Sequence, residues 1–365
     1  MKEYLRKYDV KLIVKGPVFV GSGREISKKE YIFLPDKKIG IIDIGLFSQQ
    51  MYKKGKQRQF EDFVLNERRF DLGDWMERNS VRYDTVKDCM KYVLDMGDTV
   101  LQRGTRVQVM EFIKDPYGMV YVPGSTIKGM LRTIILTSKL YNDGSAMVAD
   151  KLRRGIRNEA NLKRNRYLSR EIKETEASIL NTLNRNPERI EDAVNDYMSG
   201  FVVSDSDPID LGQLVLCQKI ERHIDETEKR LNLLRETLSP GTEIKFTITI
   251  DESVTKMGRD DILEAVSTFN DIYNECFLSK FRGVDLPSGN TVYLGGGSGF
   301  ASKTVIYSIF GEEGLKLVPE IFRNTNVPRE HGHDKDVKLG VSPHIVKCTY
   351  YEGKTLRFGE CRLEI

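Results

Sequence analysis

The stretch 242–281, TEIKFTITIDESVTKMGRDDILEAVSTFNDIYNECFLSKF, decides the fold. Its first part alternates apolar and polar residues from Ile244 to Ile250, which is typical of a half-buried strand. From Gly258 to Phe281 the apolar residues recur every three or four positions, which predicts a helix of about six turns. A second short apolar run, Thr291–Leu294, follows. The stretch therefore predicts a strand–helix–strand unit with a helix covering one face of a sheet.

The same pattern extends outward in both directions. Further strands are predicted at Val10–Val14, Tyr31–Leu34, Ile39–Ile44, Arg106–Ile113, Val120–Val122, Phe201–Ser206, Leu214–Ile220, Ile345–Tyr351 and Leu356–Ile365, and further helices at Thr126–Tyr141 and from Lys303 onward. Because strands and helices alternate in a non-adjacent order twice, we predict an α+β fold of two ferredoxin-like (RRM-type) modules. The predicted domains are 1–200 and 201–365. The first carries helical insertions at about 46–105 and 142–199.

Composition restricts the class of protein. The 365 residues include 57 Lys or Arg and 54 Asp or Glu, a formal net charge of +3, with 30% charged and 39% hydrophobic residues. This balance excludes a disordered polymer, a collagen and a membrane bundle. The N-terminus lacks the apolar core of a signal peptide, and the five cysteines form no Cys-x-x-Cys pair. We therefore expect a reduced, cytoplasmic protein with no membrane partner.

A glycine-rich stretch is the strongest candidate site. Gly295, Gly296, Gly297, Ser298 and Gly299 are followed by Lys303. Four glycines in five positions suit a tight turn that presents backbone N–H groups to a close guest such as a phosphate. A ligand-free connection is the alternative. Gly297–Thr304 also approaches a nucleotide-binding P-loop, but Ser302 replaces its second glycine, so a nucleotide hydrolase is a remote alternative.

Two further basic segments could bind a nucleic-acid backbone. The predicted helix start at Pro123–Arg132 offers Ser125 as an N-cap, with Lys128 and Arg132 one turn apart. The segment 151–173 contains nine Lys or Arg, among them Arg153 and Arg154, and only two Glu. Such cations can release counterions from RNA. The alternative for both segments is a set of solvated helix faces.

The histidines and clustered aspartates suggest little chemistry in the sequence. The stretch His331–Asp334 could be read as a metal site, but no cysteine or further histidine is nearby to complete it, so a polar loop is favoured and we expect no metal and no cofactor. No spacing identifies a catalytic residue. Asp205, Asp207 and Asp210 are typical of turns.

Several of these stretches resemble a known family. Pro17–Gly23 (PVFVGSG), Val122–Arg132 (VPGSTIKGMLR) and Gly295–Gly299 are similar to motifs of the RAMP superfamily, the repeat-associated proteins of CRISPR effector complexes. Four stretches are similar to one subfamily, the fifth subunit of type III-A (Csm) complexes: Val203–Ser206, Leu234–Thr242, Leu294–Thr304 and Gly340–His344. The resemblance spans most of the chain and is weakest over 45–105 and 142–199.

This resemblance implies a function. The subfamily caps the 3′ end of the guide RNA (crRNA) without catalysis, packs against neighbouring Csm backbone subunits near the target RNA, and supports crRNA maturation by recruited host nucleases in antiviral defence. By position, the RNA-binding residues would be Gly21, Gly23, Arg24, Ser125, Lys128, Arg132, Gly295–Gly299 and Lys303, with Arg153 and Arg154 from the variable segment. The alternative function is a metal-independent endoribonuclease that processes precursor crRNA with a histidine such as His223 or His344.

Overall fold

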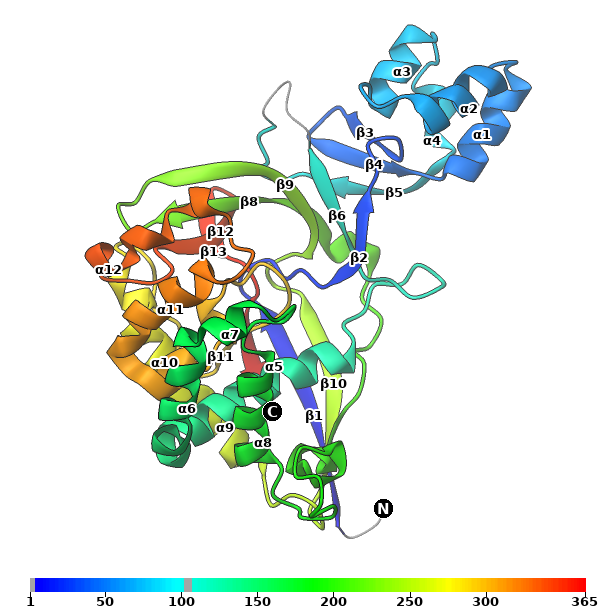
Figure 1. Cartoon of the computed structure of the whole chain (residues 1–365). Helices are drawn as coiled ribbons and strands as arrows, with labels where there is room; N and C mark the ends of the chain where they lie inside the picture. Colours follow the sequence, from blue (N-terminus) through cyan, green and yellow to red (C-terminus); the bar gives the residue numbers. More distant parts are fainter. Residues whose placement is uncertain (1–3, 102–106) are drawn as a thin grey trace.

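The computed structural model describes residues 4–101 and 107–365, arranged as two sheets with helices around them (Figure 1). The first sheet is antiparallel, in the order β11 (Thr291–Tyr293), β14 (Glu360–Glu364), β1 (Leu5–Val14), β10 (Glu243–Asp251) and β7 (Phe201–Val203). The alternation that predicted β1 and β10 reflects burial, because Leu12 and Ile244 are fully buried. Helices α5 (Gly124–Lys139) and α9 (Arg259–Cys276) pack against each other and contact β7 and β11 respectively.

The second sheet is mixed. Its order is β2 (Gly21–Ile26), β6 (Gln108–Phe112), β9 (Glu228–Leu238), β8 (Leu214–His223), β5 (Met90–Asp95), β4 (Lys38–Ile42) and β3 (Tyr31–Leu34). β12 (Ile345–Tyr351) pairs with β8 and with β13 (Lys354–Arg357). Both sheets take strands from each side of residue 200, so the predicted boundary between 1–200 and 201–365 does not separate the two sheets. Whether residues 1–200 and 201–365 are two separate folding units stays a prediction.

The first helical insertion has a small core of its own. It contains α1 (Ile44–Lys53), α2 (Gln57–Asn66), α3 (Leu72–Arg78) and α4 (Asp84–Lys87), which lie at one end of the molecule in Figure 1. The rings of Phe47, Phe60, Phe63 and Trp75 pack against one another there, with Phe63 stacked on Trp75 and Phe60 edge-on to both Phe47 and Trp75. The helices were predicted, but β5 was not. Residues 102–105 of the predicted insertion, and Arg106 of the predicted strand, lie outside the described residues.

The remaining helices are α6 (Ser145–Arg157), α7 (Glu159–Leu162), α8 (Ser169–Leu180), α10 (Ile306–Phe310), α11 (Gly314–Arg323) and α12 (Asp336–Leu339). Most of them pack on α5, on α9 or on one another: α8 contacts α5, α10 contacts α9, and α6 contacts α8, α10 and α11. α6 is held by Val148, Leu152 and Ile156, which recur every four residues on its buried face. None of the helices in the described chain has the length and apolar character needed to cross a membrane.

A buried carboxylate joins three strands of the second sheet. Glu236 on β9 is fully buried and accepts hydrogen bonds from Tyr92 Oη (2.7 Å), Phe112 N (2.9 Å) and Lys114 Nζ (2.6 Å). Burial and the adjacent Glu236 charge raise the pKa of Tyr92, which keeps its hydroxyl protonated as a donor. The network therefore ties β5 and the end of β6 to β9.

Candidate nucleic-acid interface

The glycine-rich loop follows β11 and is fastened both to the turn between β13 and β14 and to the turn between β1 and β2. Leu294 N donates to Gly359 O (2.8 Å), and Gly296 N donates to Phe19 O (2.6 Å). Gly295 has a φ of +78°, and a Cβ added there would lie 2.1 Å from Phe19 O. Only glycine satisfies both the dihedral angle and this backbone approach. The loop therefore has a defined backbone conformation and packs closely against Pro17–Val20.

Two amides of this loop remain available to a ligand. Gly297 and Gly299 have φ values of +94° and +95°. Within the described part of the chain, neither amide donates a hydrogen bond to a protein acceptor. Unpaired backbone donors in a turn of this kind can bind an anion.

Two cations without carboxylate partners flank the loop. The Arg235 guanidinium lies between the rings of Phe19 and Phe358, 5.3 and 5.5 Å from their centroids. Its Nε and Nη1 are buried without a hydrogen-bond partner. Lys303 Nζ donates to Gly295 O at 2.5 Å. No Asp or Glu in residues 4–101 or 107–365 forms an ion pair with Arg235 or Lys303.

The pKa values of Arg235 and Lys303 are both lower than usual. Burial lowers the pKa of Arg235, and burial together with the charge of Arg235 lowers the pKa of Lys303. Both shifts mean that the protein itself does not compensate the positive charge. An anion bound between them would restore both pKa values toward their ordinary range. Sequence reasoning missed Arg235, although Leu234–Thr242 was among the stretches that carried the family resemblance.

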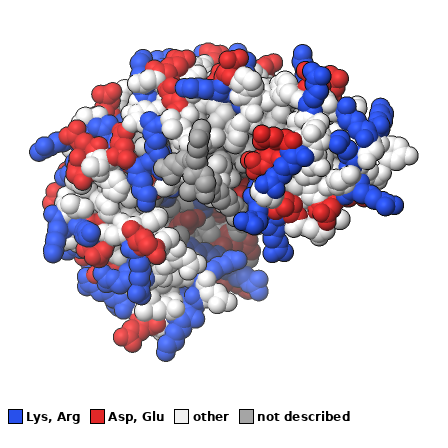
Figure 2. Space-filling model, turned by 90° about the horizontal axis from the view of Figure 1, so that it is seen from above, with Lys and Arg blue, Asp and Glu red and all other residues white. Residues whose placement is uncertain are grey.

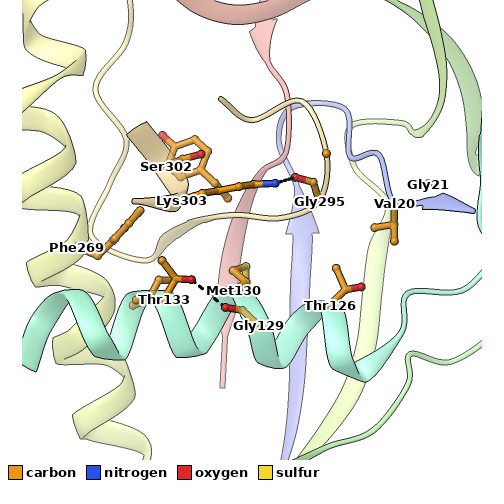
Figure 3. Close-up of a pocket in the computed structure, with 13 residues that line it drawn as sticks. Val20, Gly21, Thr126, Gly129, Met130, Thr133, Phe269, Gly295, Ser302 and Lys303 are labelled. Carbon is orange, nitrogen blue, oxygen red and sulfur yellow. Dashed lines mark hydrogen bonds between the residues drawn. The ribbon is translucent and has the colours of Figure 1, made fainter. Parts of the chain in front are cut away.

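Three distant segments meet at a pocket of about 340 Å³ beside Lys303 (Figure 3). One wall is the face of α5 that carries small or flexible residues, the opposite wall is the glycine-rich loop, and the end wall is the start of β2. The lining residues include Val20, Gly21, Thr126, Gly129, Met130, Thr133, Gly295, Gly296, Ser302 and Lys303. The three stretches that resemble RAMP motifs thus converge in space.

The start of α5 is held by the segment after β7. Pro123 is the N-cap, so the prediction that Ser125 caps this helix is wrong. Asp205 Oδ1 accepts from Gly124 N at 2.7 Å, and Ser206 Oγ accepts from Val122 N at 2.9 Å. Asp205 thus satisfies the first backbone donor of α5, and Ser206 fixes the chain just before the helix. Ser125 is exposed at the edge of the helix.

Lys128 and Arg132 lie on a different face of α5 from the pocket. Lys128 Nζ donates to Met198 O at 2.9 Å, and Arg132 pairs with Asp196 (2.5 Å) and Glu176 (3.3 Å). Residues two positions apart on a helix do not share a face, which separates Lys128 and Arg132 from Met130. Their charges are therefore partly used within the fold.

The other predicted RNA-binding residues are dispersed. Gly23 and Arg24 lie on β2, where Arg24 pairs with Glu111 (3.1 Å) and with Glu30. Arg153 pairs with Glu313 at 2.8 Å, and Arg154 donates to Asp150 O. In the segment 151–173, six cations form ion pairs: Lys151, Arg153, Arg157, Arg164, Arg170 and Lys173. Figure 2 accordingly shows basic and acidic side chains intermixed over the visible face.

The nucleotide-binding alternative lacks its structural context. Ser302 Oγ donates to Ser298 O at 3.1 Å within a 3₁₀ turn, Ala301–Lys303. Thr304 is extended, and α10 begins only at Ile306. The prediction that a helix starts at Lys303 is therefore wrong. Without a helix N-terminus at the loop, the P-loop arrangement is absent from this part of the described chain.

The histidines are closer together than the sequence suggested. His344 lies beside both His333 and His223, with ring centroids 5.2 and 5.5 Å apart. The expectation that no further histidine is near His331 and His333 is wrong, because β12 follows the loop back to the edge of β8.

Comparison with known proteins identifies the family. A model of the RAMP superfamily matches residues 11–286, and the chain belongs to this superfamily. A relative from Mycobacterium tuberculosis, CRISPR system Cms protein Csm5, is 30% identical over 100% of this chain and 99% of its own length. The predicted similarity to the fifth Csm subunit is thereby confirmed.

Solved structures support the same assignment of fold. A chain in the cryo-EM structure of a Csm–crRNA–target RNA ternary complex of a type III-A CRISPR-Cas system aligns with a TM-score of 0.66 at 18% identity, covering 98% of this chain and all of that one. The crystal structure of T. onnurineus Csm5 aligns with a TM-score of 0.60 at 16% identity, covering 96% and 99%. The predicted α+β fold of RAMP ferredoxin-like modules is confirmed.

Proposed function

We propose that this chain is a non-catalytic RNA-binding subunit of a type III-A Csm ribonucleoprotein that caps the 3′ end of the crRNA. The full-length similarity to Csm5 supports membership of such a complex. The structural neighbour comes from a complex that contains crRNA and target RNA, which supports both as partners.

One observation carries the RNA-binding part of the proposal. Around Gly297 the site offers four donors without protein acceptors, the amides of Gly297 and Gly299 and Nε and Nη1 of Arg235. Beside them lies the ammonium of Lys303, which donates to Gly295 O but has no carboxylate partner among the described residues. A phosphodiester oxygen accepts hydrogen bonds and carries negative charge, so it complements all of these groups. Holding a phosphate needs no acid, base or nucleophile. The site therefore suits retention of RNA rather than its cleavage.

The remaining surface fits a subunit with several protein neighbours. A net charge of +3 and ion-paired cations leave little general attraction for RNA. The surface outside the site would face neighbouring Csm backbone subunits and host nucleases that trim the crRNA during maturation. In antiviral defence the subunit would then define where the bound RNA ends.

An endoribonuclease is the second candidate. The observation that favours it is a second pocket of about 330 Å³, in which His331 and His333 face Ser298 and Gly299 of the glycine-rich loop. An imidazole near a 2′-hydroxyl could act as a general base.

Neutralising the two unpaired cations is expected to weaken RNA binding. Arg235→Met and Lys303→Met should each lower the affinity of the chain for crRNA by roughly 10-fold or more, because each removes a charged hydrogen bond worth about 1.5–3 kcal/mol. Each should also reduce the slope of log affinity against log salt by about 0.7. Filter binding or fluorescence anisotropy with labelled crRNA at several salt concentrations measures both quantities.

Two further variants show whether any loss of binding is specific to Arg235 and Lys303. Arg6→Gln, at the opposite end of β1 from the loop, removes an exposed cation and should change neither affinity nor slope. Lys128→Gln with Arg132→Gln tests the face of α5 outside the pocket. Unchanged binding in Arg235→Met and Lys303→Met would remove the loop from the RNA site, whatever the α5 variant does.

Incubation with labelled precursor crRNA in EDTA separates binding from cleavage. We expect the RNA to remain intact. Specific products that disappear in His331→Ala would replace the proposal with the endoribonuclease.

A further inference from the structure

All four histidines of the chain gather where β8 ends and β12 begins. His223 ends β8, His331 and His333 lie in the connection after α11, and His344 directly precedes β12. Ring centroids are 5.9 Å apart for His331 and His333, 5.2 Å for His333 and His344, and 5.5 Å for His344 and His223. Segments separated by more than a hundred residues therefore place their only imidazoles side by side.

A buried aspartate lies at the centre of this group. Asp336 is fully buried, and its carboxylate contacts His333 Nδ1 (3.1 Å), His344 Nδ1 and Ser342 Oγ (2.6 Å). No Lys or Arg in the described chain pairs with it. A buried carboxylate without a permanent cation is costly. A divalent cation held by these residues would balance its charge.

We propose that His333, Asp336 and His344 form a binding site for a divalent transition-metal ion of the Zn²⁺ type. One ligand atom from each residue lies within 4.8 Å of the other two. Two imidazoles and one carboxylate are a donor set that suits Zn²⁺ and related ions, and they do not suit Mg²⁺ or Ca²⁺, which prefer all-oxygen sites. Small side-chain rotations would bring the three atoms to metal–ligand distances of about 2.0–2.2 Å. His223, beside His344, is available for the fourth position.

The site would act as a structural clip. Asp336 begins α12, His333 precedes it, and His344 leads into β12, which pairs with β8. A shared ion would fasten the connection after α11 to the start of β12. The same connection carries His331 and His333 into the pocket that faces Ser298 and Gly299. The ion would thus fix one wall beside the glycine-rich loop. The metal site does not depend on the proposed RNA binding.

Metal titration of the full chain tests this proposal. After treatment with a chelator and its removal, the protein should bind about one equivalent of Zn²⁺ in competition with a chromophoric chelator, and its Tm should rise with added Zn²⁺. Co²⁺ should give the visible absorption of a four-coordinate ion. His333→Ala and His344→Gln should each abolish stoichiometric binding and the rise in Tm.

A matched control distinguishes a site from general metal binding. Asp334→Asn changes an exposed carboxylate two residues before Asp336 and should bind Zn²⁺ like the unmodified chain. Failure of the unmodified chain to take up Zn²⁺, or equal uptake by the double variant His333→Ala with His344→Gln, would overturn the proposal. The first of these outcomes needs no variant, so a variant that does not fold leaves the proposal testable.

Discussion

Replacing Glu236 by alanine is expected to lower the free energy of unfolding by about 3–5 kcal/mol. The substitution removes the shared acceptor of Tyr92, Phe112 N and Lys114, and it leaves the largely buried ammonium of Lys114 without its carboxylate. Breaking a buried pair in this way costs more than the pair itself contributes. Urea denaturation followed by circular dichroism measures the difference, with the slope of the transition checked for a change in cooperativity.

Two comparisons give this result its meaning. Glu243→Gln removes a carboxylate of an exposed cluster with Lys11 and Lys245, and it should leave the unfolding curve unchanged. Combining Glu236→Ala with Lys114→Met should lower the free energy of unfolding by less than the sum of the single changes, because the second substitution removes the ammonium that has lost its carboxylate. A loss below about 1 kcal/mol in Glu236→Ala would contradict the buried network.

Gly295→Ala is the second large effect that we expect. The new Cβ would lie 2.1 Å from Phe19 O, and the residue would keep a φ of +78°. A backbone oxygen cannot rotate away as a side chain can, so the loop must move and lose the hydrogen bond from Gly296 N to Phe19 O. We expect a loss of stability of several kcal/mol, about 1–2 of it from the dihedral angle, and loss of crRNA binding.

Gly23→Ala provides the matched control. Gly23 has a similar φ of +87°, but a Cβ there would meet nothing within 4 Å. It should show the cost of the dihedral angle alone. If thermal denaturation gives the two variants the same Tm, the contact between the loop and Pro17–Val20 does not hold this region together.

Much of the fold was predictable because burial leaves a regular pattern. The alternation in β1 and β10 and the spacing of Ile262, Val266 and Phe269 in α9 follow from one buried face each. β9 was missed because its sequence, EKRLNLLRETL, lacks this alternation. It forms a strand through its pairing with β8 and β6, which no local pattern reveals.

The site was only partly predictable for a related reason. The glycine-rich loop and the start of α5 are recognisable as local motifs. Arg235 was not, since its environment is made by Phe19 and Phe358 from distant parts of the chain. Lys128 and Arg132 were predicted to bind RNA because the sequence does not show that their charges are used within the fold. Their acceptors, Met198 O and the carboxylates of Asp196 and Glu176, lie far away in the sequence. A sequence shows which residues carry charge, but tertiary contacts decide which charges remain unpaired.

The position of β1 between β10 and β14 has a consequence for synthesis. Leu12 lies opposite Ile244 on one side and Leu363 on the other. During translation β1 therefore leaves the ribosome before both of its neighbours, which emerge more than two hundred residues later. It stays unpaired until then. Its open edges and the apolar side chains of Val10 and Leu12 are available for wrong pairings throughout that interval. Productive folding of the nascent chain would depend on shielding this strand until its last neighbour arrives.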